Sequence, residues 1–293
     1  MSMPLRLEDF RFVHTLRVRW AEVDMQKVVF NPHYLSYADT AMAEYWRALA
    51  FPYESSLASL GGDLFVKKST VEYFASARYD DVLQIGVKCH RVGNSSLTFH
   101  LSIFRSDVCL TTVELIYVFA NPKTARSLPL PALGKQALED FENRCPVNQL
   151  QIGDWEQLRE QVSPLRMRVF VQEQGVHESL EIDEQDPLSL HAALNNALGH
   201  CVATARLLPS HEGTSRIGRM AVERQLRGTG LGMAVLQALI DKARERGDQV
   251  VVLHAQLSAQ GFYQKAGFDP HGETFEEAEI PHIEMVLKLN SPI

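Results

Sequence analysis

The sequence predicts two α+β domains in one chain. One long helix followed by a series of strands gives way, about halfway along, to alternating strands and helices. A length of 293 residues suits two domains, and 45% hydrophobic with 22% charged residues is usual for a folded globular protein. We place the first domain at 1–142, a linker at 143–153 and the second domain at 154–293.

The first domain is predicted to be a long central helix wrapped by an antiparallel sheet. Residues 14–20 alternate between apolar and polar side chains, which predicts a half-buried strand. The helix that follows, stopped by Pro52, has an apolar face at helical spacing that consists of Tyr34, Ala38, Ala41, Met42, Tyr45 and Leu49. Strand patterns return at 64–75, 82–92, 96–104 and 109–119, and a short helix is expected at 133–141.

The second domain is predicted to hold a mixed sheet with helices on its faces. The expected elements are a helix at 164–174, strands at 190–195, 200–208 and 216–222, a helix at 231–246, a strand at 250–255, a helix at 259–266, and strands near Phe268 and at 282–289. An acidic loop precedes these strands and carries Glu178, Glu181, Asp183, Glu184 and Asp186. Such a loop could attract a cationic amine, but a run of this kind is more often a solvated face.

Composition and charge narrow the classes of partner. The net charge is −7 and the basic residues form no cluster, so we expect no nucleic-acid partner. The chain has no apolar run of membrane-spanning length and no signal-peptide pattern at its start, so we expect no membrane association and a cytoplasmic location. The cysteines are scattered without a C-x-x-C pair, which favours buried free thiols over disulfides or metal ligation: Cys89, Cys109, Cys145 and Cys201.

A glycine-rich loop lies between a predicted strand and an amphipathic helix. The loop reads Arg227, Gly228, Thr229, Gly230, Leu231, Gly232. Glycines at alternate positions allow a tight turn, and the helix start adds unpaired N–H groups that favour an anion such as a pyrophosphate. The loop lacks the lysine of a nucleotide-hydrolysing P-loop, and no βαβ unit opens here as a dinucleotide fold requires. A helix start that needs glycine only for packing is the alternative.

Three segments in this order resemble the GNAT acetyltransferase family over about 155–289: residues 217–222, 227–232 and 261–268. Residues 169–174 and 280–283 resemble its ElaA-like branch. The resemblance implies acetyl-CoA as substrate, a pyrophosphate held by residues 227–232, and pantetheine paired with the main chain of Met220, Ala221 and Val222. It also implies Tyr263 as the general acid that protonates the leaving thiolate, where the alternative is a residue packing on the sheet. Glu173, His254 and His282 are candidate bases for the acceptor amine, although a structural role is the commoner one for each.

Asp24 stands between the first predicted strand and the long helix. A carboxylate here could attack a thioester or activate water, but a single aspartate can also simply cap a turn or helix. Residues 20–34, together with the strand–helix–strands order over about 12–120, resemble hotdog-fold acyl-CoA thioesterases of the 4-hydroxybenzoyl-CoA type. The resemblance implies Asp24 as the catalytic carboxylate, the main chain of Asn31 as oxyanion donor, and a homodimer or higher homo-oligomer. Lys27 replaces the glycine of the family motif D-x-x-G.

We therefore expect a bifunctional enzyme that hydrolyses an acyl-CoA in its first domain and transfers an acetyl group to a small-molecule or peptide amine in its second. Neither mechanism needs a metal. The alternative is an acyl-CoA-sensing hotdog module that regulates the acetyltransferase without hydrolysis, which Lys27 favours. In a third possibility the acetyltransferase half is inactive and the thioesterase is the only enzyme.

Overall fold

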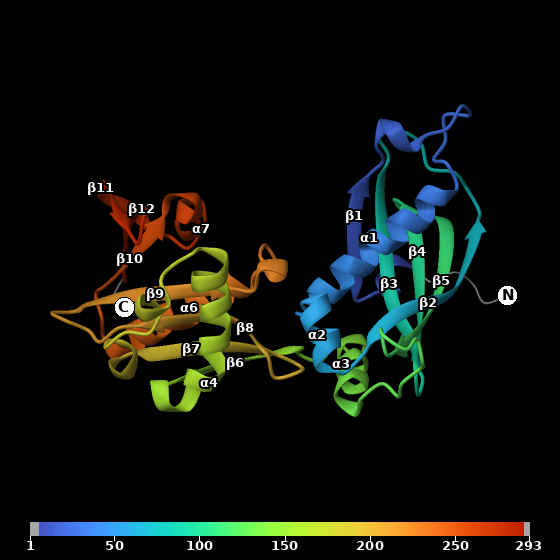
Figure 1. The fold of residues 1–293 in the computed structure, drawn as a ribbon. Helices are drawn as coiled ribbons and strands as arrows, with labels where there is room; N and C mark the ends of the chain where they lie inside the picture. Colours follow the sequence, from blue (N-terminus) through green and yellow to red (C-terminus); the bar gives the residue numbers. More distant parts are fainter. Residues whose placement is uncertain (1–5, 290–293) are drawn as a thin grey trace. The chain divides into compact units, whose positions relative to one another are not determined.

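The computed structural model describes residues 6–289, and the chain divides into two compact units, Met1–Val147 and Asn148–Ile293. Figure 1 shows the ribbon of each unit coloured along the sequence.

The first unit is a five-stranded antiparallel sheet with one long helix across it (Figure 1). Its elements are β1 (Phe12–Arg17), α1 (Pro32–Ala48), α2 (Tyr53–Ser59), β2 (Asp63–Tyr73), β3 (Val82–Val92), β4 (Ser96–Arg105), β5 (Val108–Ala120) and α3 (Ala132–Glu142). The strands lie in the order β1-β3-β4-β5-β2, so β1 and β2 are the two edges. This arrangement confirms the predicted long helix packed on an antiparallel sheet.

Helix α1 is held to the sheet by the apolar face that the sequence predicts. Tyr34, Ala38, Ala41 and Tyr45 are each at most 1% exposed. The ring of Tyr45 meets Phe99 of β4 edge-on, with 5.5 Å between the ring centroids. Burial of these rings is the main stabilising contribution, because each removes a large apolar area from water.

The prediction that Pro52 stops this helix places its end too late. The last helical residue is Ala48, and Ala50 has a φ of 56°, in the left-handed region, which ends the helical path. Pro52 is instead the residue before α2, a short helix that the sequence analysis missed. Proline at such a start costs nothing, since its missing N–H would be unpaired there anyway.

The second unit is a seven-stranded mixed sheet with helices on both faces. Its elements are β6 (Asn148–Gly153), α4 (Trp155–Arg166), a π-helix (Met167–Glu173), α5 (Glu178–Glu181), β7 (Leu190–Asn196), β8 (Cys201–Leu207), β9 (Thr214–Val222), α6 (Leu231–Arg246), β10 (Val250–Gln256), α7 (Gln260–Lys265), β11 (Asp269–Glu277) and β12 (Ile280–Lys288). The strand order is β11-β12-β10-β9-β8-β7-β6, and the β9–β10 pair is parallel.

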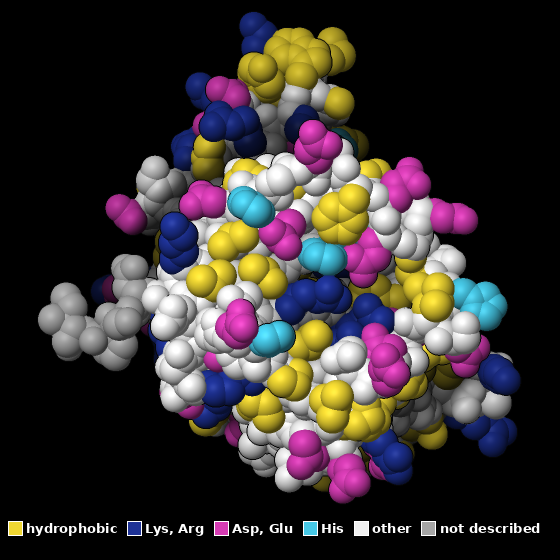
Figure 2. Space-filling model, turned by 90° about the vertical axis from the view of Figure 1, so that its left-hand side faces the viewer, with side chains coloured by type: hydrophobic (Ala, Val, Ile, Leu, Met, Phe, Trp, Pro, Cys, Tyr) yellow, Lys and Arg dark blue, Asp and Glu magenta, His cyan; other side chains and the backbone are white. Residues whose placement is uncertain are grey.

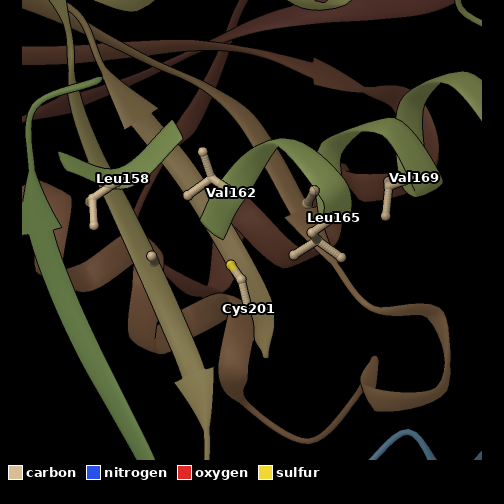
Figure 3. Packing of buried hydrophobic residues seen from close by; sticks show 7 residues of the cluster. Leu158, Val162, Leu165, Val169 and Cys201 are labelled. Atoms are coloured by element: carbon tan, nitrogen blue, oxygen red, sulfur yellow. The ribbon is translucent and has the colours of Figure 1, made fainter. Parts of the chain in front are cut away.

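The helices α4 and α6 cover opposite faces of this sheet. Ala221 belongs to a buried cluster with Leu158, Val162 and Leu165 of α4, most of which Figure 3 labels. A Cβ on Gly232 of α6 would instead lie 3.0 Å from the side chain of Val222. Successive residues of a strand point to opposite faces, so the two helices lie on opposite sides of β9.

Two boundaries in this unit differ from the sequence prediction. Residues 148–153, assigned to a linker, form edge strand β6, which pairs with β7 from Asn148 to Gly153. The first helix begins at Trp155 rather than at Pro164, because the side chain of Asp154 accepts a hydrogen bond from the Gln157 N–H and caps it. Pro164 lies inside the helix, shortly before its path widens into the π-helix.

Candidate active sites

The sheet of the second unit opens between β9 and β10. These parallel strands pair only where Val250–Val252 lies beside Thr214–Arg216, although β9 continues to Val222 and β10 to Gln256. Beyond this short register the facing main-chain edges are not bonded to each other. Such an edge can accept an extended ligand as an additional strand.

A cavity of about 610 Å³ lies at this opening and is lined by β9, β10, the glycine-rich loop, the π-helix and α7. Of the predicted cofactor residues, six line it: Met220, Val222, Arg227, Gly228, Gly230 and Gly232. Thr229 and Leu231 belong to the loop without lining the cavity, and Ala221 is buried under α4. Figure 2 views the molecule from the side of this unit and shows a hollow where Lys or Arg side chains lie beside histidines and acidic groups.

The glycine-rich loop has the conformation that its glycines permit. Gly228 and Gly230 have φ values of 82° and 90°, and Gly230 is the residue before helix α6. Within residues 6–289, the main-chain N–H groups of Gly228, Gly230 and Gly232 donate no hydrogen bond to other main-chain groups. N–H groups without partners at a helix start form a site for an anion.

Tyr263 of α7 lines the same cavity and is 8% exposed. Burial raises the pKa of its phenol to about 12. Its ring packs against Phe262 and Phe268, and its hydroxyl makes no hydrogen bond within the described part of the chain. The phenol therefore keeps its proton at neutral pH and has it available for a group in the cavity.

Two of the candidate bases lie at the cavity. His254 Nδ1 is 2.7 Å from Glu277 Oε2, and His282 Nδ1 is 2.7 Å from the Ile280 carbonyl oxygen. His254, Glu277 and His282 all line the cavity. Glu277 was missed in the sequence, because only the strand register of β11 and β12 brings it next to a histidine 23 residues away.

The carboxylate of Glu173 is bound by a side chain of the glycine-rich loop. Arg227 donates from both terminal nitrogens to the Glu173 carboxylate, at 2.6 and 2.8 Å. The hydrogen bond from Arg227 lowers the pKa of Glu173, which makes it a weaker base.

The acidic loop is only in part a solvated face, because Glu178 and Glu184 are exposed but the other three acids are not. Glu181 and Asp186 are buried, and Asp183 is bonded by Arg206 and Arg219. Three arginines neutralise these acids from three elements: Arg166 of α4, Arg206 of β8 and Arg219 of β9. These three carboxylates thus hold the loop to the sheet, and as ion-paired groups they are poorly placed to attract an amine.

In the first unit, Asp24 lies in a tight loop before α1. Its Oδ1 accepts the main-chain N–H groups of Gln26 (2.8 Å) and Val28 (3.4 Å). Within residues 6–289, Oδ2 accepts no hydrogen bond. The loop thus fixes one oxygen of the carboxylate and leaves the other open to a ligand.

Asn31 immediately precedes α1, and its own main-chain N–H donates no hydrogen bond within the described residues. Its carbonyl oxygen accepts the hydroxyl of Tyr73 at 3.2 Å, which ties the loop to β2. Lys27 has a φ of 61°, in the left-handed region. The lysine therefore keeps the turn that glycine favours, at a cost in backbone strain.

Within residues 6–289, no group of three or more His, Cys, Asp or Glu side chains is placed to hold a metal ion. In the same part of the chain, no helix has the length and apolar character needed to span a membrane.

Comparison with known proteins identifies the class of the second unit. The model of the acetyltransferase (GNAT) domain matches residues 158–289. A UPF0039 protein of Schizosaccharomyces pombe is 37% identical over 127 residues, which cover 43% of this chain and 84% of that protein. Protein ElaA of Escherichia coli is 35% identical over 129 residues, covering 43% of this chain and 84% of ElaA. The chain belongs to the GNAT acetyltransferase family.

The first unit matches a different family. The model of the thioesterase superfamily matches residues 26–110. A protein of Aquifex aeolicus named "Putative esterase" is 25% identical over 122 residues, which cover 42% of this chain and 94% of that protein. The chain thus joins a hotdog domain of the thioesterase superfamily to a GNAT domain, and both predicted resemblances are confirmed.

Proposed function

We propose that this protein is a bifunctional acyl-CoA enzyme. The first domain hydrolyses an acyl-CoA thioester to a free acid and CoA, and the second transfers an acetyl group from acetyl-CoA to an amine. The observation that carries the proposal is that each domain has a reactive group without a hydrogen-bond partner on one of its atoms, together with main-chain N–H groups that donate to no main-chain group within residues 6–289.

In the second domain, three features support acetyl transfer. The N–H groups of Gly228, Gly230 and Gly232 suit the CoA pyrophosphate, and the open edge of Met220 to Val222 suits the pantetheine arm. Tyr263 supplies the proton that the CoA thiolate takes as it leaves. Arg227 would contribute its charge beside the phosphates if it left Glu173.

In the first domain, Asp24 supports hydrolysis. Its free oxygen attacks the thioester carbonyl or takes a proton from the attacking water, and the C–S bond breaks to release CoA. The Asn31 N–H at the start of α1 stabilises the negative charge that develops on the carbonyl oxygen.

We also propose that the hotdog domain forms a homodimer or a higher homo-oligomer. Edge strand β2 exposes Phe65, Val66 and Tyr73, and an exposed apolar edge favours pairing with a second copy. Tyr73 links this edge to the Asn31 loop, so the partner copy would lie beside the site. Light scattering tests this: a monomer at micromolar concentration would contradict it.

The test of both activities is a crossed pair of variants. CoA release from a panel of acyl-CoAs without amine measures hydrolysis, and CoA release from acetyl-CoA with an amine panel measures transfer. Asp24→Asn should lower hydrolysis about 100-fold or more and leave transfer unchanged, while Tyr263→Phe should do the reverse. Absence of hydrolysis of every acyl-CoA by the wild type would remove the thioesterase from the proposal.

Lys27 favours one alternative, in which the hotdog domain binds acyl-CoA without hydrolysing it and regulates acetyl transfer. This position has a left-handed φ of 61°, which glycine favours, and it carries an exposed side chain. Acetyl transfer that responds to a long-chain acyl-CoA, in a protein that hydrolyses none, would support this alternative.

A further inference from the structure

We propose that the acceptor of acetyl transfer is an amine that also carries an anionic group. In this proposal His254, oriented by Glu277, takes the proton from the amine, and Arg216 binds the anion. This inference rests on the proposed acetyltransferase activity and assigns the acceptor side of the same cavity.

The strand register places these groups on one face of the sheet. On β10, Val251, Leu253 and Ala255 are buried, whereas His254 and Gln256 alternate with them and line the cavity. Paired residues of neighbouring strands share a face, so His282 of β12, the partner of Gln256, lies on the cavity side too. The partner of His282 on β11 is Phe275, and Glu277 follows two residues later on that face.

Arg216 joins this face from the other side of β10. It pairs with Val252, which lies two residues before His254. Val222 lies six positions further along β9, a span of about 20 Å in an extended strand. Arg216 is therefore far from the glycine-rich loop and too distant to bind the CoA pyrophosphate there.

The contact with Glu277 fixes the tautomer of His254. A carboxylate oxygen can only accept, so the Nδ1 of His254 must carry the proton in the 2.7 Å contact. The lone pair of the neutral ring is then on Nε2, which makes no hydrogen bond within residues 6–289. Burial would raise the pKa of Glu277, but the hydrogen bond from His254 lowers it, so the carboxylate stays ionised and stabilises an imidazolium.

The other candidate bases are less suitable. Glu173 is paired with Arg227. His282 also has a proton on Nδ1, since it donates to the Ile280 carbonyl, but within residues 6–289 no carboxylate is hydrogen-bonded to it, and Glu277 acts on it only through charge at longer range. The charged and titratable groups that face His254 are Glu277 on β11, Glu284 and His282 on β12, and Arg216 on β9.

The charges of the cavity lining indicate that the acceptor amine also carries an anionic group. The arginines that line the cavity are Arg206, Arg216, Arg219 and Arg227. Arg206 and Arg219 are ion-paired with Asp183, and Arg227 is ion-paired with Glu173. Arg216 forms neither a hydrogen bond nor an ion pair within the described part of the chain. Its charge acts on Glu277 only at longer range than an ion pair, and that carboxylate is hydrogen-bonded to His254. A guanidinium at the acceptor end without a directly bonded carboxylate favours a carboxylate or phosphate on the substrate.

The reaction balances with these groups. The acceptor ammonium gives one proton to His254 Nε2, and the free amine forms the C–N bond to the acetyl carbon. The C–S bond breaks, and the CoA thiolate takes the proton of Tyr263. The nitrogen loses its second proton as the amide forms, and this proton replaces the one that Tyr263 gave. The proton on His254 passes to solvent.

The first test compares amines that differ only in the anion. We would measure acetylation of β-alanine against propylamine and of phosphoethanolamine against ethanolamine. The wild type should prefer the anionic member of at least one pair by about 10-fold or more in kcat/KM. Arg216→Met should raise KM for that member about 10-fold and leave KM for acetyl-CoA unchanged. Equal use of both members in both pairs would overturn the anionic acceptor.

The second test separates His254 from its neighbours. His254→Gln should lower kcat about 100-fold at pH 7, with a loss that shrinks as pH rises and the free amine forms unaided. Glu277 is a positioning residue, so Glu277→Gln should move the rising limb of the pH–rate profile to a different pH. His282→Gln should stay within about threefold of wild type. The matched control is His271→Gln, which breaks a similar contact with Glu284 (2.8 Å) outside the cavity lining. A greater loss in His282→Gln than in His254→Gln would overturn the assignment.

A binding measurement distinguishes failure of this inference from failure of the acetyltransferase itself. If the wild type acetylates no amine, calorimetry of phosphoethanolamine and β-alanine with the CoA-saturated protein still tests the anion site. Binding that Arg216→Met weakens about 10-fold supports the site. Absence of binding in the wild type overturns it.

Discussion

Arg166 and Asp186 form a buried two-point ion pair, with nitrogen–oxygen distances of 2.7 and 3.0 Å. Arg166 also donates to the carboxylate and the carbonyl of Glu181, so one side chain of α4 pairs with both buried acids of the acidic loop. All three side chains are at most 2% exposed. A guanidinium and carboxylates in such a place are stable only together, since each alone would be an unpaired buried charge.

Arg166→Met should therefore destabilise the protein severely. Loss of one partner of a buried pair costs about 3–5 kcal/mol in the free energy of unfolding. Urea denaturation followed by circular dichroism measures this. Arg244→Met is the matched control, because Arg244 pairs with Asp241 on the surface with about half of each side chain exposed, and its loss should cost less than about 1 kcal/mol. Equal losses in the two variants would contradict the role of Arg166.

Gly232→Ala should weaken binding of acetyl-CoA. The new Cβ would lie 3.0 Å from the side chain of Val222, which is closer than ordinary van der Waals contact, so the Val222 side chain or the start of α6 must shift by a few tenths of an ångström. The shift moves the N–H groups at the helix start, and we expect KM for acetyl-CoA to rise about 10-fold with a loss of about 1–2 kcal/mol in stability.

Gly261→Ala is the control for this substitution. A Cβ on Gly261 meets nothing within 4 Å, and this glycine lies in short helix α7. Its KM for acetyl-CoA should stay within about twofold of wild type, with stability unchanged or slightly higher because alanine favours a helix. A normal KM in Gly232→Ala would contradict the close approach of α6 to β9.

The sequence predicts those parts of the fold and site that depend on local patterns. Helix α6 has the predicted bounds, Leu231–Arg246, because its apolar spacing starts at a glycine loop and stops at Gly247, whose φ is 87°. The left-handed glycines of the glycine-rich loop are predictable for the same reason. Edge strand β6 is not, since its alternating residues are only half-buried or exposed and resemble a linker.

The sequence analysis names His254 and His282 of the acceptor side as candidate bases, but it could not predict the arrangement around them, because strand register brings these residues together. Arg216, His254 and Glu277 lie on three strands and share no local motif. The sequence analysis missed the buried ion pairs of the acidic loop for a related reason. A run of acidic residues resembles a solvated segment unless the arginines that bury it, on α4, β8 and β9, are already known to lie nearby.

Lys27→Gly should relieve strain in the Asp24 loop. A side chain at a φ of 61° destabilises the folded state by about 1–2 kcal/mol, and glycine would remove this strain. The greater freedom of glycine in the unfolded chain offsets about 0.5–1 kcal/mol of the stability gained in this way. We expect a net gain of up to about 1 kcal/mol, measured by thermal unfolding. Lys27→Ala removes the charge but keeps the strain, so its stability should stay within about 0.5 kcal/mol of wild type. Equal effects of the two variants would assign the change to charge.

If Tyr263 is the general acid, the pH–rate profile of acetyl transfer should show no falling limb below about pH 10. Burial raises the pKa of its phenol to about 12, and an acid with a raised pKa keeps its proton to higher pH. The rate measured with an amine acceptor should rise as bases titrate and then stay level across pH 8–10. Tyr263→Phe should lower the rate about 100-fold over this whole range.

Tyr263→Phe should change stability little, because the hydroxyl makes no hydrogen bond within residues 6–289 and the ring contacts with Phe262 and Phe268 remain. An unchanged melting temperature would therefore assign the lost rate to the missing proton and not to misfolding. A falling limb below pH 10 in the wild type that disappears in Tyr263→Phe would instead show that this phenol ionises early, against the effect of its burial.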